Sequence, residues 1–564
     1  MKNTIAELLA GTLAEHLDKE AILRLIEIPP SPDMGDFSFP CFSLARVLRK
    51  SPTAIAEELS QKLSGSNGIE KISVISGYCN FFIDRNILVR TILEKASTPD
   101  FGRSNDGSRV VIEFASPNTN KPLHLGHLRN MAIGESIARI YQFAGNNVTR
   151  TSINNDRGVH ICKSMLAYSL EGRGDTPEST GKKSDHFVGD YYVLFSRKAA
   201  TDESLNEQAQ SLLQKWEAGD RQTRDLWKTM NHWAFEGFAA TYALFGIKFD
   251  KEYYESDIYT FGKDIITEGL SRGIFTRRAD GATVIDLDSE KLGEKVLLRS
   301  DGTSVYIVQD LYLAVLKKKE FDYDQSVYVV GNEQEYHFAV LKAIFKRLGY
   351  PIADSIHHLS YGMVELPEGR MKSREGTVVD ADNLIGETSA LAAEEVRTRY
   401  QLTNSEVEER SLKIALAAIK YQLLRVDTAK NMLFDPKKAI CFEGDTGPYL
   451  LYSYARAASI IRKALQQNLS ADSSVVAELN ASELALVRKI GSFPDAIAAA
   501  YRKLSPSVVA AYAFELSQLF NEFYHNSPVL GSDQAGFRLH LVGAFREILK
   551  NSLWLLGIDA IEEM

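Results

Sequence analysis

The spacing of hydrophobic residues divides this chain into three blocks, each with its own predicted structure. In the first block, residues 1–107, apolar positions recur at helical spacing from Ile5 to Leu13. Ser51, which is followed by proline, is a typical start of a second helix. Runs of β-branched and aromatic residues at 71–76 and 78–83 then predict strands. A small α+β domain is therefore expected over this block.

The second block, residues 108–403, alternates short apolar runs with helical segments. The runs at 110–114, 148–153 and 326–331 are rich in β-branched residues and are predicted to be strands. Strands that alternate with helices predict an α/β fold, a Rossmann-like doubly wound parallel sheet. Between about 170 and 290 this alternation stops, which predicts an insertion whose aromatic residues are core.

The third block, residues 404–564, is predicted to be an all-helical bundle. Val542, Phe545 and Leu549 lie on one face of its last helix. A long helix rich in alanine and leucine is expected over 412–431.

Composition excludes several classes of protein. With 45% hydrophobic and 25% charged residues the chain resembles ordinary globular proteins, and no apolar run approaches the roughly 18 residues of a membrane span. The N-terminus lacks the pattern of a signal peptide. A net charge of −9 argues only weakly against a nucleic-acid partner, because the distribution of Lys and Arg matters more than their total. The four cysteines show no metal-ligand spacing, so we expect neither disulfides nor protein-bound zinc, and a cytoplasmic location fits.

The clearest chemistry lies where the strand at 110–114 passes through a polar turn into a helix. His124, Gly126 and His127 stand at the entrance of this helix. The first N–H groups of a helix lack partners and attract anions. Gly126 lets a ligand approach the backbone, and two imidazoles can donate hydrogen bonds to a phosphate. The pattern predicts a nucleotide site.

The tetrapeptide His124-Leu125-Gly126-His127 resembles the HIGH signature of class I aminoacyl-tRNA synthetases. Other nucleotidyl transferases share it, and a helix entrance with two surface histidines is the alternative. The lead-in from Glu113 to Asn118, with Lys121-Pro122, is similar to the arginyl-tRNA synthetase version. The resemblance implies that His124, His127 and Lys121 stabilise charge on the phosphorus of ATP, which is used with Mg²⁺.

A second motif lies at Arg370-Met371-Lys372-Ser373-Arg374, between two glycines. It resembles the KMSKS loop of the same class, which closes over the polyphosphate, but serine replaces its second lysine. The resemblance suggests that Lys121 supplies the missing phosphate contact. The alternative is a surface loop bounded by glycines.

Arginine as substrate would need carboxylates, because its guanidinium offers five donors and no acceptor. Tyr306 and Asp310 lie four apart on a predicted helix and so share one face. They resemble the family's substrate-reading pair, and Glu113 would add a second carboxylate. Glu113 and Asp310 could instead be structural anions paired with Arg129 or Arg150. The same resemblance implies that Ser116, Asn118 and Gln334 contact the amino end of arginine or shape its pocket. It also implies that the backbone at Gly362, Met363 and Val364 lies against adenine.

The third block resembles the anticodon-binding domain of arginyl-tRNA synthetases. Tyr449, Tyr452 and Arg456 are its candidate tRNA contacts, because unstacked bases bind to aromatic and guanidinium planes. Core packing is the alternative for these tyrosines. The first block resembles the N-terminal additional domain, which contacts the D-loop of the tRNA, and the segment 33–37 is either part of that contact or a structural turn.

These resemblances imply a monomeric arginine–tRNA ligase whose partners are tRNA, L-arginine and ATP. Members of the family typically need bound tRNA before they activate the amino acid. Two alternatives remain at this point. A class I ligase for another amino acid would keep the histidines without the acidic pocket, and a non-catalytic paralogue would retain the fold for tRNA binding alone.

Overall fold

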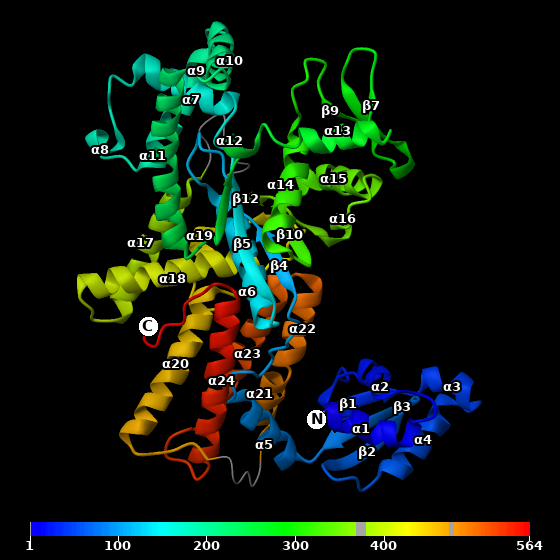
Figure 1. Cartoon of the computed structure of the whole chain (residues 1–564). Helices are drawn as coiled ribbons and strands as arrows, with labels where there is room; N and C mark the ends of the chain where they lie inside the picture. The colour runs from blue at the N-terminus through cyan, green and yellow to red at the C-terminus, as the bar shows by residue number, and fades with distance from the viewer. Residues whose placement is uncertain (1, 368–378, 473–478) are drawn as a thin grey trace. The chain divides into compact units, whose positions relative to one another are not determined.

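The computed structural model describes residues 2–367, 379–472 and 479–564. Within these ranges no helix is long and apolar enough to cross a membrane. The chain divides into two compact units, which are described separately (Figure 1). The first comprises Met1–Phe101, Ala457–Ser492 and Gln518–Ile548, and the second Gly102–Arg456, Phe493–Ser517 and Leu549–Met564.

The first unit opens with the predicted α+β arrangement. Its strands form an antiparallel sheet in the order β1-β3-β2. Ser51 caps the second predicted helix, because its hydroxyl accepts a hydrogen bond from the Ala54 N–H at 3.2 Å. The elements are α1 (Lys2–Leu13), α2 (Lys19–Leu25), β1 (Phe37–Pro40), α3 (Phe42–Leu48), α4 (Pro52–Leu63), β2 (Ile69–Ile75), β3 (Tyr78–Ile83) and α5 (Arg85–Ala96).

Asp36 holds the turn at 33–37 in place. Its carboxylate is buried and accepts hydrogen bonds from the Ile83 N–H at 2.9 Å and from Nη2 of Arg488 at 2.6 Å. Arg488 belongs to a helix of the same unit, α21 (Ala481–Gly491). A structural role therefore accounts for this aspartate, and tRNA contact by the rest of the segment stays a prediction.

The second unit is built on a five-stranded parallel sheet, which confirms the predicted fold class. Its strands are β4 (Arg109–Glu113), β5 (Asn147–Asn154), β6 (Lys251–Tyr254), β10 (Gln325–Gly331) and β11 (Ile356–Tyr361), in the order β11-β10-β4-β5-β6. The apolar residues of β4 and most of those of β10 are buried, as expected of strands in the middle of a parallel sheet.

One strand lies where none of the main sheet was expected. β6 falls within 170–290 and pairs with β5 at the sheet edge. Its sequence, Lys-Glu-Tyr-Tyr, has no aliphatic run because two of its four residues are exposed. The rule that buried strands are apolar therefore did not find it.

Along the chain, helices alternate with these strands, and the second unit also contains a small antiparallel sheet in the order β7-β8-β9. The elements before β10 are α6 (Leu125–Phe143), α7 (Val159–Glu171), α8 (Pro177–Thr180), α9 (Ser184–Ala199), α10 (Ser204–Glu217), α11 (Arg221–Phe245), α12 (Glu255–Ile258), α13 (Lys263–Ser271), β7 (Thr276–Arg277), β8 (Thr283–Leu287), β9 (Gly293–Leu298) and α14 (Tyr306–Phe321). Those after it are α15 (Glu335–Arg347), α16 (Ile352–Ser355), β12 (Val364–Glu365) and α17 (Ala381–Arg399).

The third block is helical as predicted, with one short strand and one helix that ends early. The helix expected over 412–431 is α18 (Asn404–Leu424), and past its end the carbonyl groups of Thr428 and Lys430 accept hydrogen bonds from Arg129. The remaining elements are β13 (Met432–Leu433), which pairs with β12, α19 (Pro436–Ala439), α20 (Gly447–Gln466), α22 (Phe493–Lys503), α23 (Pro506–Asn526) and α24 (Ala535–Leu555).

Candidate active site

The entrance of α6 orients both histidines through its own backbone. His124 is the N-cap, and its Nδ1 accepts a hydrogen bond from the Gly126 N–H at 3.1 Å. Nδ1 of His127 accepts in turn from the His124 N–H at 3.1 Å. A ring nitrogen that accepts carries no proton, so each neutral imidazole has its proton on Nε2.

Both imidazoles are held in the neutral form. Burial, with help from the charge of Lys121, lowers the pKa of His124 to about 3. Burial also lowers the pKa of His127 well below its usual value, and His124 and Lys121 add to this effect. The entrance therefore offers two neutral donors and leaves the positive charge to Lys121 and the helix dipole.

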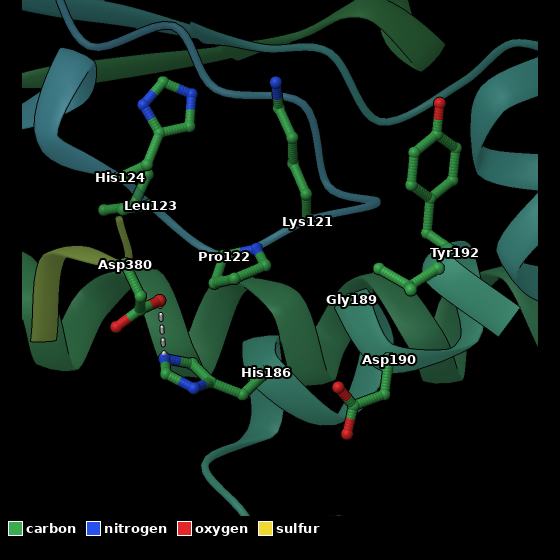
Figure 2. Close-up of a pocket in the computed structure, with 10 residues that line it drawn as sticks. Lys121, Pro122, Leu123, His124, His186, Gly189, Asp190, Tyr192 and Asp380 are labelled. Atoms are coloured by element: carbon green, nitrogen blue, oxygen red, sulfur yellow. Dashed lines mark ion pairs between the residues drawn. The ribbon is translucent and has the colours of Figure 1, made fainter. Parts of the chain in front are cut away.

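A cavity of about 180 Å³ lies beside this entrance. In Figure 2 the side chains of Lys121, His124 and Tyr192 extend to the same side, away from the ion pair of His186 with Asp380. Burial lowers the pKa of Lys121. The lining combines the turn before α6, helix α9 and the residue before α17: Lys121, Pro122, Leu123, His124, His186, Gly189, Asp190, Tyr192, Val193 and Asp380.

The backbone at 379–381 runs directly beside the histidines. The Leu125 N–H donates to the carbonyl of Val379 at 3.0 Å, and the Ala381 N–H donates to that of Leu123 at 3.0 Å. His124 and Asp380 thereby form an antiparallel bridge. The predicted loop from Arg370 to Arg374, with Met371, Lys372 and Ser373, lies outside the described residues.

Asn130 fastens the ends of three strands to α6. Its Oδ1 accepts from the Ala115 N–H at 2.5 Å, and its Nδ2 donates to the carbonyl of Val329 at 2.8 Å and to the Tyr361 hydroxyl at 3.2 Å. Ala115 and Ser116 have φ values of 69° and 48°, a backbone region that costs free energy for residues with a Cβ. The hydrogen bond from Ala115 helps to hold the strained turn that follows β4.

Arg129 is fully buried and binds only backbone carbonyl groups among its described hydrogen bonds. It donates to Gly362 at 2.7 Å and Met363 at 2.9 Å on one side, and to Thr428 at 3.3 Å and Lys430 at 2.7 Å on the other. Burial lowers its pKa to about 10, so it stays charged at neutral pH. This one side chain therefore joins the segment after β11 to the segment after α18.

The close approach of these two segments requires glycine at position 362. A Cβ there would lie 2.5 Å from the carbonyl carbon of Lys430, which no real Cβ tolerates. The positions expected to face adenine, Gly362, Met363 and Val364, are thus held between Arg129 and β13, and Met363 is exposed.

The expected arginine-reading pair lies on α14 as predicted. Tyr306, in its first turn, is 71% exposed, and Asp310 one turn later is half-exposed. Nε2 of His337 lies 2.7 Å from Oδ2 of Asp310. An open phenol and an accessible carboxylate on one helical face suit a planar cationic ligand.

Glu113, the other expected carboxylate, is buried at the end of β4 and forms an ion pair with Lys317 of α14, which is fully buried. The alternative pairings predicted for these acids are wrong. Arg129 binds carbonyl groups, and Nε of Arg150 lies 2.7 Å from Glu135. Glu113 does have a structural partner, Lys317, but the two residues lie so far apart in the sequence that no local pattern indicated the pair.

The three smaller candidates for the arginine pocket have separate environments. Ser116 sits in the strained turn, and its Oγ accepts from the Ile153 N–H at 3.5 Å. Asn118 and Gln334 are exposed, Asn118 beside the end of β5 and Gln334 just before α15.

Family sequence models match nearly the whole chain. The class I (R) tRNA synthetase catalytic domain matches residues 89–436, the DALR anticodon binding domain 450–564 and the arginyl tRNA synthetase N terminal domain 2–83. The chain belongs to the arginyl-tRNA synthetase family. An arginine–tRNA ligase of Treponema denticola is 44% identical over 99% of this chain and 98% of its own, and one of Parabacteroides distasonis is 41% identical over 94% of both.

Solved structures of the family share the fold. The Thermus thermophilus arginyl-tRNA synthetase has 27% identity and a TM-score of 0.86, with both chains covered completely. The Plasmodium falciparum enzyme, at 20% identity and a TM-score of 0.80 over 100% and 98% of the two chains, supports the fold alone. The predicted family, fold class and arginine–tRNA ligase activity are therefore confirmed, and the use of ATP follows from the class I catalytic domain.

In this arginyl-tRNA synthetase the expected tRNA contacts lie on α20. Nη2 of Arg456 donates to the Tyr452 hydroxyl at 2.7 Å, and its guanidinium stands 4.5 Å from the centre of that ring. Both side chains are partly exposed, whereas Tyr454 nearby is buried. Tyr449 packs edge-on against Phe514, with ring centres 5.7 Å apart.

Arg129 and Asn130 were not recognised as site residues from the sequence. The available signal was two adjacent polar residues flanked on both sides by apolar ones, Leu128 before them and Met131-Ala132-Ile133 after them, since polar residues in such a setting need buried partners. Lys317, Lys183 and His186 gave no comparable signal.

Proposed function

We propose that this chain activates L-arginine by attack of its carboxylate on the α-phosphate of ATP, supplied with Mg²⁺ as substrate, which forms arginyl-adenylate and releases pyrophosphate. A terminal ribose hydroxyl at the 3′ end of tRNA then takes the arginyl group, and AMP leaves. The observation that carries this proposal is the arrangement of Lys121, His124 and the neutral His127 at the entrance of α6. No protein nucleophile is required. The side chains act by positioning the reactants and by stabilising charge that develops on the phosphorus.

The roles at the phosphates follow from charge. Nε2–H of His124 and of His127 would donate to phosphate oxygens, and Gly126 would let the nucleotide reach the helix entrance. Lys121 would supply the cation that Ser373 does not. Arg370, Lys372 and Arg374 would close over the pyrophosphate, and the backbone at Gly362–Val364 would contact adenine.

Arginine itself would lie against α14. Asp310 and Tyr306 would bind the guanidinium, and Glu113 would share its carboxylate between Lys317 and the substrate. Ser116, Asn118 and Gln334 would hold the amino end. For tRNA we propose contacts at Tyr449, Tyr452 and Arg456 and in the N-terminal domain, because the aromatic and cationic side chains of α20 are partly exposed.

The proposal keeps the domain limits expected from the sequence, 1–107, 108–403 and 404–564. It also includes a monomeric state, a cytoplasmic location and the lack of protein-bound zinc. All three described buried cysteines, Cys41, Cys79 and Cys162, are free thiols, and Cys441 is exposed.

Exchange of pyrophosphate into ATP tests the proposal, measured with each amino acid in turn, with and without tRNA. We expect exchange only when arginine and its tRNA are both present. Exchange with another amino acid would indicate a ligase of different specificity. Tight tRNA binding by folded protein without any exchange would indicate a non-catalytic paralogue.

A further inference from the structure

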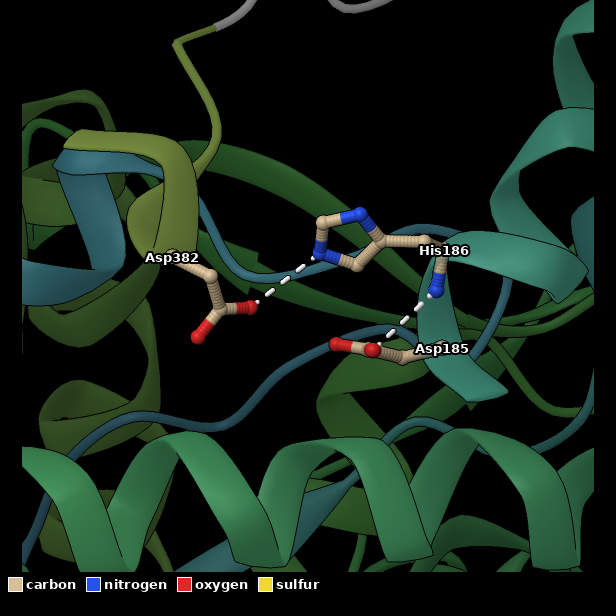
Figure 3. Close-up of side chains that lie close together, drawn as sticks. All are labelled: Asp185, His186 and Asp382. Atoms are coloured by element: carbon tan, nitrogen blue, oxygen red, sulfur yellow. Dashed lines mark hydrogen bonds and ion pairs between the residues drawn. The ribbon is translucent and has the colours of Figure 1, made fainter. Parts of the chain in front are cut away.

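A group of charged residues joins the inserted helices to the start of α17. Lys183, just before α9, has its Nζ 2.7 Å from Asp382, 3.2 Å from Asp185 and 2.6 Å from the hydroxyl of Thr241 on α11. Nε2 of His186 lies 3.1 Å from both Asp380 and Asp382. Figure 3 shows His186 between Asp382 and Asp185, whose carboxylate also accepts from the His186 N–H at 3.1 Å.

The positive and negative charges of this cluster stabilise one another. Asp380 and Asp382, which hydrogen-bond to the imidazole, raise the pKa of His186 to about 10, so His186 is charged at neutral pH. Burial raises the pKa of Asp382, but the hydrogen bonds from His186 and Lys183 outweigh it and bring the pKa to about 2. Two cations already occupy the space between the three carboxylates, and the group therefore acts as an ion-pair lock between elements.

The lock reaches the catalytic entrance through one residue. Asp380 contacts His186 by its side chain, while its backbone forms the bridge with His124. One turn along α9, Gly189 approaches the turn before α6 so closely that a Cβ would lie 2.6 Å from Cδ of Pro122. Helix α9 is thus linked to the segment around His124 at two points, directly through Gly189 and by way of Asp380 through His186.

We propose that Lys183 and His186 are positioning residues of the amino-acid activation step, which hold Asp380 and Asp382 and through them fix His124. This inference rests on the proposed role of His124 at the phosphates. The lock touches neither Tyr306 nor Asp310, so its loss changes catalysis and leaves arginine binding nearly intact.

The test is arginine-dependent pyrophosphate exchange by the full-length protein with tRNA. His186→Gln should lower kcat by about 10²-fold, the cost typical of a misplaced catalytic group, with the KM for arginine changed less than about threefold. Lys183→Arg, which keeps the charge, should retain most activity, whereas Lys183→Met should behave like His186→Gln. His232→Gln is the matched control, because that histidine lies on α11 with a side chain 70% exposed.

A double-mutant cycle with Asp382→Asn adds a readout that general destabilisation does not give. His186→Gln and Asp382→Asn should each lower kcat, and the double variant should be little worse than either. If His186→Gln does not fold, Thr241→Val removes the hydroxyl that accepts from Lys183 and donates to Asp382, without removing a charge, and should lower kcat roughly fivefold, again without raising the KM for arginine.

The proposal is overturned if folded His186→Gln and Thr241→Val lose no more kcat than His232→Gln, or if the KM for arginine rises as much as kcat falls. Absence of arginine-dependent exchange in the unsubstituted protein would instead contradict the proposed function. The two failures are therefore distinguishable.

Discussion

At the residue scale, the helix entrance assigns two tasks to different side chains: orienting a phosphate and neutralising its charge. His124 and His127 accept backbone N–H groups on Nδ1 and are kept neutral by burial. Neutral imidazoles can orient a phosphate but cannot neutralise it. We propose that Lys121, which lines the same cavity, supplies that charge.

We therefore expect Lys121→Ala to impair adenylate formation more than arginine binding. Removal of one donor to a developing oxyanion typically lowers kcat by about 10²-fold. Single-turnover formation of arginyl-adenylate measures the first effect, and equilibrium binding of arginine measures the second. Lys215→Ala, which removes an exposed lysine from α10, is the control. Equal losses in both measurements would contradict the role given to Lys121.

Glu113 shows why residue roles need the structure as well as a motif. The lead-in to the histidines predicts a substrate carboxylate, yet this carboxylate is buried against the ammonium group of Lys317. A buried ion pair is costly to break on one side only, so either partner alone is hard to replace. Its strand, β4, lies between β5 and β10 in the sheet, and the residue is only 6% exposed.

At the scale of elements, α6 does more than present the histidines. Its first turn carries the cap, and the next turn carries Arg129 and Asn130, which together contact β4, β10, β11 and the segment after α18. The helix is buried along almost its whole length, so these polar side chains must find partners inside the protein.

Arg129→Lys should destabilise the second unit by roughly 3 kcal/mol, because an ammonium group cannot serve four carbonyl groups in two directions and buried carbonyl groups lose their partners. Urea unfolding followed by fluorescence measures the change. The KM for ATP should also rise, since Gly362 and Met363 lose their anchor. Arg221→Lys, at a side chain 96% exposed on α11, should leave both unchanged. An unaltered unfolding midpoint in Arg129→Lys would disprove the anchoring role.

At the scale of the whole molecule, the neutral histidines make stability depend on pH. The folded-state pKa of His124, about 3, lies below the ordinary value of 6.5, so the unfolded chain binds a proton that the folded chain does not bind. Stability from this group is present above pH 6.5 and is lost as the pH falls toward 3.

We expect His124→Asn to gain about 2 kcal/mol of stability relative to the unsubstituted protein between pH 7 and pH 5, since 1.5 pKa units separate pH 5 from the unfolded value. Asparagine keeps the N-cap, so the comparison isolates titration. Urea unfolding at both pH values measures the difference. His232→Asn, at an exposed histidine, should show no such gain. A constant difference between the two pH values would mean that His124 binds protons equally in the folded and unfolded chains, so that its pKa is not lowered by folding.

The inserted helices also belong to this scale. They sit between β5 and β6 in the sequence and look like an appendage there. In the structure their Lys183 and His186 bind the residues that begin α17, nearly 200 positions later. The insertion therefore takes part in building the entrance at His124.

Local sequence patterns were enough to predict the elements that carry chemistry. Period and turn residues predicted β4, β5, β10, the helix entrance and the α14 pair, because each depends on neighbours a few positions away. Family resemblance supplied the activity. The edge strand β6 and the end of α18 escaped this reasoning, since the strand is half-exposed and the segment past the helix is bound by a side chain distant in the sequence.

The partners that these elements meet become visible in the folded chain alone. Arg129 binds carbonyl groups about 230 and 300 positions away, Lys317 reaches Glu113 across 204 positions, and Asp380 links His186 to His124. Such pairs carry no local pattern. They arise because a parallel sheet brings the ends of separate strands to one edge, where buried charges must find one another.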